Sequence, residues 1–408
     1  MEQLHLLITG SVDHGKSTLI GRLLVDTRSL TREKVAELER VSREFGEETA
    51  FAFVTDHLRE EREQAKTIDT TQVFFKSRKR NYVIIDTPGP LEFIKNMITG
   101  TSVADAAVLI VDAKEGITEQ TKRHAFLISL LGIDPLIVVC NKMDLVDYSQ
   151  DRFKELKGGA LEFLQRLGIT PVYVIPISAK TGENVSDKSN ALGWFDGPSL
   201  IKAVDALTIS QKAGLKPLRL PIQDIYTAFS PALVVGRLAS GSIRKGESVV
   251  ILPPAEKATV REIKFFGRRG IKKAVAGESI GLILDNASVL RRGYVLAQTK
   301  DQPKLTQYFS GNVFWMGAQP LRIGVPFTLR CATQEVTCIA EKIEQRIDSS
   351  TLEVREAEAR ELALNEAGIV HFKSERPIVT ERFSFIEELG RFAIEDESGL
   401  RGLGIIVS

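Results

Sequence analysis

A glycine-rich segment near the start of the chain limits the fold more than any other feature. Its sequence, GSVDHGKS at Gly10–Ser17, matches the pattern GxxxxGK[ST]. It follows the apolar run LHLLIT and opens the helix-like run KSTLIGRLL. Such a loop wraps its backbone N–H groups around phosphate oxygens at the N-terminus of a helix. We therefore predict a phosphate-binding loop formed by Gly10, Ser11, Val12, Asp13, His14, Gly15, Lys16, Ser17 and Thr18.

Three side chains of this loop have predicted roles. Lys16 should reach the β- and γ-phosphates of a nucleoside triphosphate, and the Ser17 hydroxyl should ligate Mg²⁺. His14 lies inside the loop, where a metal-binding or acid–base role would be one use for it. We interpret His14 instead as a residue that shapes the loop.

Buried strands and helices alternate along the first half of the chain. Short runs rich in Val and Ile, such as YVIID, AAVLIVD and PLIVVC, are separated by helix-like runs such as TKRHAFLISLLG. This alternation predicts an α/β domain, residues 1–212, whose mostly parallel sheet is covered by helices on both faces. After QKAGLKPLRLP, helical periodicity gives way to short strands with Gly and Pro turns. We expect two antiparallel β-barrel domains there, at 213–301 and 302–408.

Composition excludes several classes of protein. The formal net charge is +1, with 43% hydrophobic and 26% charged residues, so no strong overall field attracts nucleic acid or anionic membranes. No apolar run reaches the ~18–20 residues that span a bilayer, and the opening MEQLHLLITG lacks the cationic start of a signal peptide. The three cysteines are scattered and lack metal-ligand spacing. We expect a cytoplasmic protein with no membrane association and with buried, reduced thiols.

Two further motifs follow strands and indicate which base is bound. NKMD at Asn141–Asp144 ends the run PLIVVC, and SAK at Ser178–Lys180 ends VYVIPI. Ligands of open α/β sheets bind at the carboxyl ends of the strands. The Asp144 carboxylate can accept from two N–H groups on one edge of guanine, a pair that adenine does not offer. We predict a GTP/GDP site whose base-binding residues are Asn141, Lys142, Asp144, Ser178, Ala179 and Lys180.

The motifs GSVDHGKSTL, TIDTT, DTPG, NKMD and SAK together resemble the GTPase domain of translation elongation factors of the Tu/1-alpha class. The resemblance covers the whole chain, because that family also carries two β-barrels after the GTPase domain. The ending GRFAIEDESGLRGLGIIV is similar to the close of the family's third domain. The resemblance implies GTP and Mg²⁺ as cofactors.

Several stretches resemble one branch of this family, the large subunit of bacterial sulfate adenylyltransferase. They are Ser11 within GSVDHGKSTLIGRLL, the run NKMDLVDYS, GWFDGPSL at Gly193–Leu200 and VFWMGAQPL at Val313–Leu321. This likeness implies a partner, a small sulfate-adenylylating subunit, and coupling of GTP hydrolysis to formation of adenylyl sulfate from ATP and sulfate. The alternative is an elongation-factor-like GTPase that delivers aminoacyl-tRNA to the ribosome. A third hypothesis is a GTP-bound scaffold that has lost turnover.

The same resemblance assigns residues that would sense the γ-phosphate. Thr67 in EREQAKTID would ligate Mg²⁺, Asp86 of DTPG would bind Mg²⁺ through water, and the Gly89 N–H would hold the γ-phosphate. Contacts made only with GTP would order these segments, and hydrolysis would release them.

Two departures from the family pattern surround the predicted position of the attacking water. Pro90 replaces the histidine that family members use to orient water, and Ala65-Lys66 replaces a Gly-Ile pair. Proline has no side-chain donor or acceptor, and it restricts the preceding Gly89 to extended conformations. We therefore predict intact GTP binding and weak intrinsic hydrolysis. Lys66 is a candidate for supplying positive charge to the transition state, and Gln64 or Glu92 for positioning water.

Two basic runs are candidates for binding RNA phosphates: SRKR at 77–80 and FGRRGIKK at 266–273. They lack interleaved aromatic residues for stacking on bases. We interpret both as solvated hairpin tips.

Overall fold

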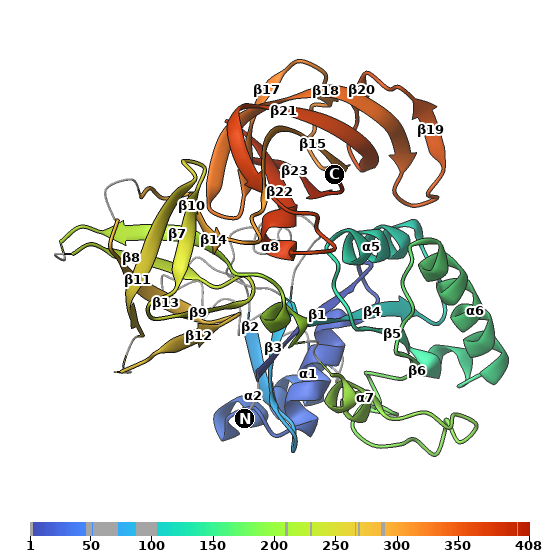
Figure 1. Cartoon of the computed structure of the whole chain (residues 1–408). Helices are drawn as coiled ribbons and strands as arrows, with labels where there is room; N and C mark the ends of the chain where they lie inside the picture. The colour runs from blue at the N-terminus through green and yellow to red at the C-terminus, as the bar shows by residue number, and fades with distance from the viewer. Residues whose placement is uncertain are drawn as a thin grey trace. The chain divides into compact units, whose positions relative to one another are not determined.

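The computed structural model describes residues 3–45, 51, 72–86, 104–208, 211–228, 231–265, 267, 270–286, 290–397 and 399–408 (Figure 1). The chain folds as two compact units, Met1–Ile209 and Ser210–Ser408. The first unit is an α/β domain and the second holds two antiparallel barrels, which confirms the predicted fold class. The predicted boundary at 301/302 falls between the strands of the two barrels, and the division into three domains stays a prediction.

The first unit is built on a six-stranded sheet with the order β2-β3-β1-β4-β5-β6. Neighbouring strands pair in parallel except β2, which is antiparallel to β3. The strands are β1 (Gln3–Gly10), β2 (Gln72–Lys76), β3 (Asn81–Asp86), β4 (Ala106–Asp112), β5 (Leu136–Asn141) and β6 (Tyr173–Pro176). Every residue of β4 and β5 is buried, as expected for strands covered on both faces.

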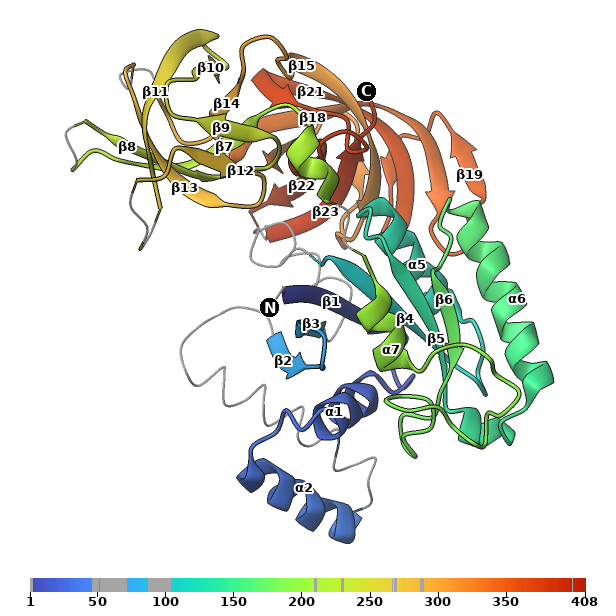
Figure 2. The same ribbon diagram turned by 60° about the horizontal axis from the view of Figure 1, so that its bottom comes forward.

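Helices cover both faces of this sheet. They are α1 (Lys16–Asp26), α2 (Arg32–Phe45), α5 (Glu119–Leu130), α6 (Gln150–Arg166) and α7 (Leu200–Ala206), with the 3₁₀ turn η1 at Met143–Val146. Figure 2 shows α1 and α7 on one side of the sheet and α5 and α6 on the other. Thr118 caps α5 by accepting from the N–H of Thr121, and Ser149 caps α6 by accepting from Arg152. These caps explain where the two helices begin.

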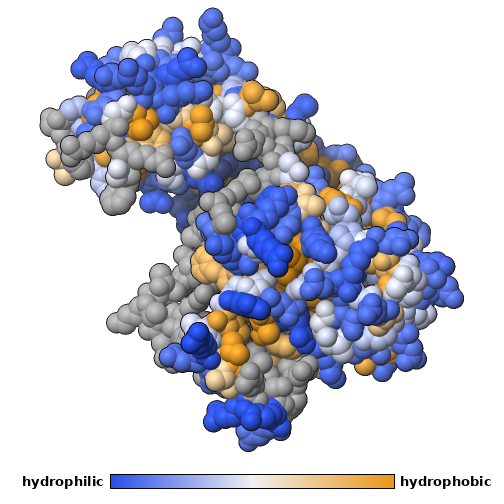
Figure 3. Space-filling view, turned by 90° about the horizontal axis from the view of Figure 1, so that it is seen from below, coloured by the Kyte–Doolittle hydropathy of each residue, from blue (hydrophilic) through white to orange (hydrophobic). Residues whose placement is uncertain are grey.

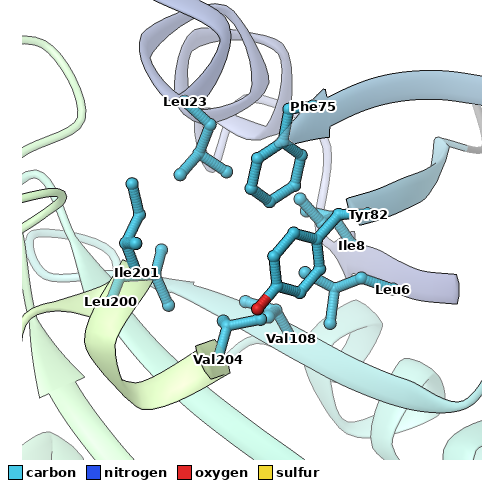
Figure 4. Close-up of a pocket in the computed structure, with 9 residues that line it drawn as sticks. All are labelled: Leu6, Ile8, Leu23, Phe75, Tyr82, Val108, Leu200, Ile201 and Val204. Carbon is cyan, nitrogen blue, oxygen red and sulfur yellow. The ribbon is translucent and has the colours of Figure 1, made fainter. Parts of the chain in front are cut away.

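The core between the sheet and helices α1 and α7 is closely packed. Figure 4 shows a small apolar void of about 10 Å³ in this core, next to Tyr82 and Phe75. The two rings stack with centroids 4.5 Å apart. The void is about the size of one water and its lining is apolar, so we treat it as a packing gap.

One predicted surface feature is wrong in part. Ser77 and Arg80 of the SRKR run are buried, at 8% and 7% exposure, while Arg78 and Lys79 are exposed. The cause is Asp205 in α7, whose carboxylate accepts a hydrogen bond from the Ser77 hydroxyl at 2.6 Å. The β2–β3 turn is therefore held against α7 instead of lying free in solvent.

The second unit begins with a closed six-stranded barrel of order β10-β11-β13-β8-β7-β14. Its strands are β7 (Arg219–Tyr226), β8 (Leu233–Arg237), β10 (Ser248–Leu252), β11 (Glu256–Lys264), β13 (Ser279–Leu284) and β14 (Val295–Gln298). A separate two-stranded sheet pairs β9 (Ser242–Arg244) with β12 (Lys273–Val275). The short 3₁₀ turn η2 (Gln211–Leu215) precedes β7.

The second barrel is a sheet of order β17-β22-β23-β15-β21-β18-β19, in which β17 also pairs with β18 and so closes a ring that leaves only β19 outside. Its strands are β15 (Lys304–Trp315), β17 (Pro326–Cys331), β18 (Gln334–Asp348), β19 (Val354–Ala357), β21 (Glu366–Thr380), β22 (Arg391–Asp396) and β23 (Gly399–Ile406). A small pair, β16 (Leu321–Arg322) and β20 (Glu361–Leu362), and a short helix, α8 (Glu387–Gly390), complete it. Trp315 ends β15 as a buried core residue, and its indole donates to Gln319 O at 2.7 Å.

A buried arginine joins the two barrels. Arg219 in β7 is 1% exposed. Its guanidinium lies 2.7 Å from the Glu381 carboxylate and 3.0 Å from that of Asp301, and it also donates to Asp301 O at 2.8 Å. Apolar side chains of both barrels pack beside it in one cluster: Val250, Leu252, Val295, Ala297, Val379, Ile386 and Leu389. Ion pair and apolar cluster together fix one barrel on the other.

We expect Glu381→Ala to lower the free energy of unfolding by about 2 kcal/mol, because a buried guanidinium loses a charged hydrogen-bond partner while keeping Asp301. Glu375→Ala removes an exposed carboxylate of β21, the strand that ends just before Glu381, and serves as the matched control. Urea denaturation of the full chain measures both variants. Equal small losses in the two would show that the Arg219–Glu381 contact contributes little.

Hydrophilic residues make up most of the face drawn in Figure 3, with hydrophobic ones in small scattered groups, as is usual for a surface in contact with water. Within the described ranges, no helix has the length and apolar character needed to cross a membrane. The three cysteines, Cys140, Cys331 and Cys338, are buried and free. Burial raises the pKa of each thiol to about 12, so these thiols are unreactive.

Candidate nucleotide site

The loop between β1 and α1 has the backbone shape that the sequence predicts. Gly15 adopts a left-handed conformation, with φ of 86°, as the residue that begins α1. A Cβ on Gly15 would lie 2.5 Å from Asn141 Nδ2, and one on Gly10 would lie 2.6 Å from Ile110 O. Both positions therefore require glycine for space as well as for backbone conformation.

Lys16 lies over this loop. Its ammonium group donates to Gly10 O at 2.8 Å and to Ser11 O at 2.7 Å. The first turn of α1 carries no acidic residue, so nothing there opposes the partial positive charge of the helix N-terminus. Lysine and helix end together favour a bound phosphate.

Asn141 connects the phosphate loop to the SAK segment. It is 1% exposed. Its Nδ2 donates to His14 O at 2.9 Å, and its Oδ1 accepts from Ala179 N at 2.9 Å. The sequence predicts Ala179 among the base-binding residues, whereas here its N–H donates to Asn141. Asn141 thus holds the two loops at a fixed separation.

Lys142 is held by a buried carboxylate. Its Nζ lies 2.8 Å from Asp112 Oδ2, and Asp112 is 2% exposed. Burial raises the pKa of Asp112, but hydrogen bonds from Lys142 and from the backbone N–H groups of Glu115 and Lys114 outweigh it, so the pKa is lowered overall. The carboxylate stays ionised and fixes the lysine stem at the end of β5.

Asp144 offers an acceptor that nothing in the described part of the chain uses. It lies in η1, directly after the NK pair, and its Oδ1 is buried without a hydrogen-bond partner among the described residues. A buried carboxylate oxygen without a donor is costly, and buried polar groups are nearly always paired. A ligand N–H at this position would satisfy it, which matches the predicted contact with guanine.

Arg22 is a residue of the site that sequence reasoning missed. Its Nε donates to Ala179 O at 3.1 Å, and its Nη2 donates to Lys180 O. It also lies 3.9 Å from Asp26 and over the ring of Phe51. Arg22 therefore ties the SAK segment to the helix that follows the phosphate loop. Nothing in the local pattern of α1 distinguishes this arginine from a solvent-exposed one.

A second missed feature is the polar face of α5 that lies under the phosphate loop. Ser11 Oγ lies 2.6 Å from Thr118 Oγ1 and 3.2 Å from Thr121 Oγ1. The backbone N–H of Val12 donates to Gln120 Oε1 at 3.2 Å. Near the start of α5, two threonines thus contact the Ser11 hydroxyl and Gln120 accepts from the loop backbone.

Two buried histidines complete this support. The His14 ring is fully buried, with Nδ1 3.2 Å from Ile110 O and Nε2 3.4 Å from Glu115 Oε2. His124 Nδ1 lies 2.8 Å from Thr9 Oγ1. The contacts of His14 agree with a residue that shapes the loop.

Acidification should destabilise the first unit through His124. Burial, followed by the charges of Lys16 and His14, lowers the pKa of His124 from 6.5 to about 4. Between these two pKa values the unfolded chain binds more protons at this histidine than the folded chain does. The contribution of neutral, buried His124 to the free energy of unfolding is therefore fully present above pH 6.5 and is lost as pH falls toward 4. The loss is on the order of 3 kcal/mol. Urea denaturation at pH 7 and at pH 4.5 should show a smaller pH effect in His124→Gln; an unchanged pH effect would contradict this assignment.

Of the residues predicted to bind Mg²⁺, sense the γ-phosphate or assist hydrolysis, some are described by the structure and others are not. Ser17 lies in the first turn of α1, beside the loop, and Asp86 ends β3. Thr67, Lys66, Gly89 and Pro90 lie outside the described residues, as do Gln64 and Glu92. Among the residues that are described, no group of three or more His, Cys, Asp or Glu side chains is arranged to hold a metal ion by itself. Of the three predicted Mg²⁺ residues, the structure therefore describes Ser17 and Asp86, and a Mg²⁺ ion would also need nucleotide oxygens, as is usual for Mg²⁺.

The fold and these loops define a P-loop nucleotide-binding domain followed by two β-barrels. The family model for the elongation factor Tu GTP-binding domain matches residues 1–210, and the model for the GTP-eEF1A C-terminal domain-like family matches 308–407. The chain therefore belongs to the translational GTPase superfamily that contains elongation factors Tu and 1-alpha.

Curated relatives fall on two branches of this superfamily. Sulfate adenylyltransferase subunit 1 of Alteromonas mediterranea is 35% identical over 100% of this chain and 87% of its own length. Elongation factor 1-alpha of Staphylothermus marinus is 38% identical over 99% and 96%, and that of Archaeoglobus fulgidus is 37% identical over 100% and 97%. A solved structure of sup35 with GMPPNP is 26% identical over 100% and 94%, with a TM-score of 0.47; at that TM-score it adds nothing to the assignment.

Proposed function

We propose that this chain is the GTP-binding regulatory subunit of a sulfate adenylyltransferase. In this proposal it acts in the cytoplasm with a separate small subunit that forms adenylyl sulfate from ATP and sulfate. The observation that carries the GTP part is the buried Oδ1 of Asp144 in η1, which has no hydrogen-bond partner among the described residues. It lies in the same motif as Asn141, which is bonded to the phosphate loop at one side and to the SAK segment at the other.

In this proposal, different residues bind the phosphates, the base and the Mg²⁺ ion. Lys16 and the N-terminus of α1 supply positive charge for the β- and γ-phosphates. Asp144 accepts from the guanine edge, and Lys142 is held in place by Asp112 at 2.8 Å. Bound Mg²⁺ would neutralise phosphate charge, with the Ser17 and Thr67 hydroxyls as its proposed ligands from this chain and Asp86 binding it through water. Thr67, Asp86 and Gly89 are the proposed sensors of the γ-phosphate.

Support for the sulfate-activation branch comes from the relative of that name and from the stretches GWFDGPSL and VFWMGAQPL. The second candidate, a factor that delivers aminoacyl-tRNA to the ribosome, is favoured by the elongation factor 1-alpha relatives, whose identities to this chain are as high. Hydrolysis is proposed to be weak in either case, because Pro90 has no side-chain group that can orient water.

Co-purification separates the two candidates. The tagged full chain, loaded with GTP, is mixed with a small sulfate-adenylylating subunit in one arm and with aminoacyl-tRNA at physiological salt in the other. We expect this chain to form a stable complex with the small subunit. We expect it to retain no more aminoacyl-tRNA than unrelated competitor RNA. Retention of aminoacyl-tRNA with no protein complex would contradict it and favour the second candidate.

A further inference from the structure

A cavity in the first barrel of the second unit lies far along the chain from the phosphate loop and has no part in the proposed GTP site. It is a depression open to solvent, with a volume of about 530 Å³, between the β9–β10 turn, the segment that enters β7 and the end of β14. The side chains that line it and matter here are Lys216, Ser242, Arg244, Lys245, Glu247 and Gln298. Its volume is within the range of about 300–1,000 Å³ that is typical of small-molecule sites.

The lining is strongly cationic. Lys216, Arg244 and Lys245 contribute three positive charges, and Glu247 is the one carboxylate among the described lining residues. Glu247 Oε2 accepts from the backbone N–H of Arg244 at 2.9 Å, so it is engaged by the turn. None of the three cations is in an ion pair with a described carboxylate. Their charge is therefore available to an anion inside the cavity.

The neighbouring strand increases the positive charge of this region. In the β9–β12 pair, Arg244 lies directly opposite Lys273. The next residue, Lys245, donates its backbone N–H to Lys272 O at 3.0 Å. Like charges directly opposite one another destabilise a strand pair. A bound anion would offset that repulsion, which is a reason for four cations to be gathered at one end of the β9–β12 sheet.

The walls of the cavity are fixed by hydrogen bonds. Gly241 N donates to Ala213 O at 2.9 Å, and the Ser240 hydroxyl donates to Pro217 O at 2.6 Å. Gly246 N donates to Val260 O at 2.7 Å. Gly241 has φ of 74°, and a Cβ there would lie 2.6 Å from Leu218 N. Because these segments are held before any ligand arrives, binding costs little ordering of the backbone.

We propose that this cavity binds the phosphate or sulfate group of a nucleotide-sized molecule. Three cations repel a metal ion and attract an oxyanion, and the guanidinium of Arg244 has the planar donors that bind two oxygens at once. Ser242 and Gln298 add neutral polar groups for the remainder of the ligand. This inference does not depend on the proposed function.

The test uses the full chain saturated with GDP and Mg²⁺, so that the phosphate loop is occupied. Isothermal titration measures binding of pyrophosphate, sulfate and adenosine 5′-monophosphate, and a short single-stranded RNA provides the macromolecular arm. The variant is Arg244→Ala/Lys245→Ala. The matched control is Lys257→Ala/Arg261→Ala, which removes one lysine and one arginine from exposed positions of β11 outside the cavity. Circular dichroism establishes that each variant is folded.

We expect at least one of the three small anions to bind wild type, and the cavity variant to bind it at least about tenfold more weakly while the control binds as wild type does. Tighter binding of adenosine 5′-monophosphate than of pyrophosphate would identify a nucleotide, and the reverse an oxyanion alone. Absence of small-anion binding to folded wild type would overturn the proposal. So would equal weakening in variant and control, or binding of RNA alone with a steep dependence on salt.

Discussion

Asp144→Asn should weaken GTP binding by on the order of 10²–10³-fold and should make xanthosine triphosphate the better ligand. In the proposed site the wild-type carboxylate would accept two hydrogen bonds from guanine, and each hydrogen bond to a charged group contributes about 1.5–3 kcal/mol. The amide of asparagine has one acceptor and one donor group. Its donor matches the carbonyl that xanthine carries where guanine carries an amino group. Fluorescence titration with labelled GTP and xanthosine triphosphate measures both constants.

Asp147→Asn is the matched control for this exchange. Asp147 follows the same 3₁₀ turn, is exposed, and adopts a left-handed conformation that asparagine tolerates. It should leave the affinities for both nucleotides unchanged. If the two aspartate variants behaved alike, the base would not be recognised by Asp144, and the assignment of the pocket to guanine would be wrong.

Pro90→His should raise the single-turnover rate of GTP hydrolysis by ~10²–10⁴-fold, because a group that positions water or assists proton transfer contributes about that much. Wild type should hydrolyse GTP slowly, near the ~10⁻⁴ s⁻¹ of unassisted GTPases. Lys66→Ile, tested alone and together with Pro90→His, measures whether the lysine supplies charge to the transition state. Rapid quench with radiolabelled GTP follows the reaction.

Nucleotide affinity serves as the internal control for the hydrolysis variants. Each variant should bind GTP as tightly as wild type, so that a change in rate belongs to the chemical step. Fast hydrolysis by wild type without any partner would disprove the prediction of weak turnover. A Pro90→His variant that binds GTP but gains no rate would show that the position alone does not restore catalysis.

The fold was predictable because its strongest signals are local. The phosphate loop combines a strand, a fixed glycine spacing and a helix within one short stretch, and β4 and β5 are apolar throughout because helices cover both faces. The change to short strands after about residue 213 likewise marks the barrels. Each of these patterns depends on neighbours in the chain, so sequence alone is sufficient to recognise it.

The parts that were missed depend on contacts between distant residues. Arg22 donates to the backbone at Ala179, 157 positions away, and Ser11 meets Thr118, 107 positions away. Arg80 was expected in solvent, yet the turn that carries it is held by Asp205 of α7. Periodicity and composition carry no information about such pairs. Motifs predict which residues bind the nucleotide, whereas the residues that hold those motifs together were recognised only in the folded chain.

The most direct test of the account is GTP turnover by the full chain, alone and with the small sulfate-adenylylating subunit, ATP and sulfate. The account predicts slow turnover by the chain alone and faster turnover only when partner, ATP and sulfate are all present, with adenylyl sulfate as product. Fast turnover by the chain alone, or turnover that responds to aminoacyl-tRNA and ribosomes but not to the small subunit, would contradict it.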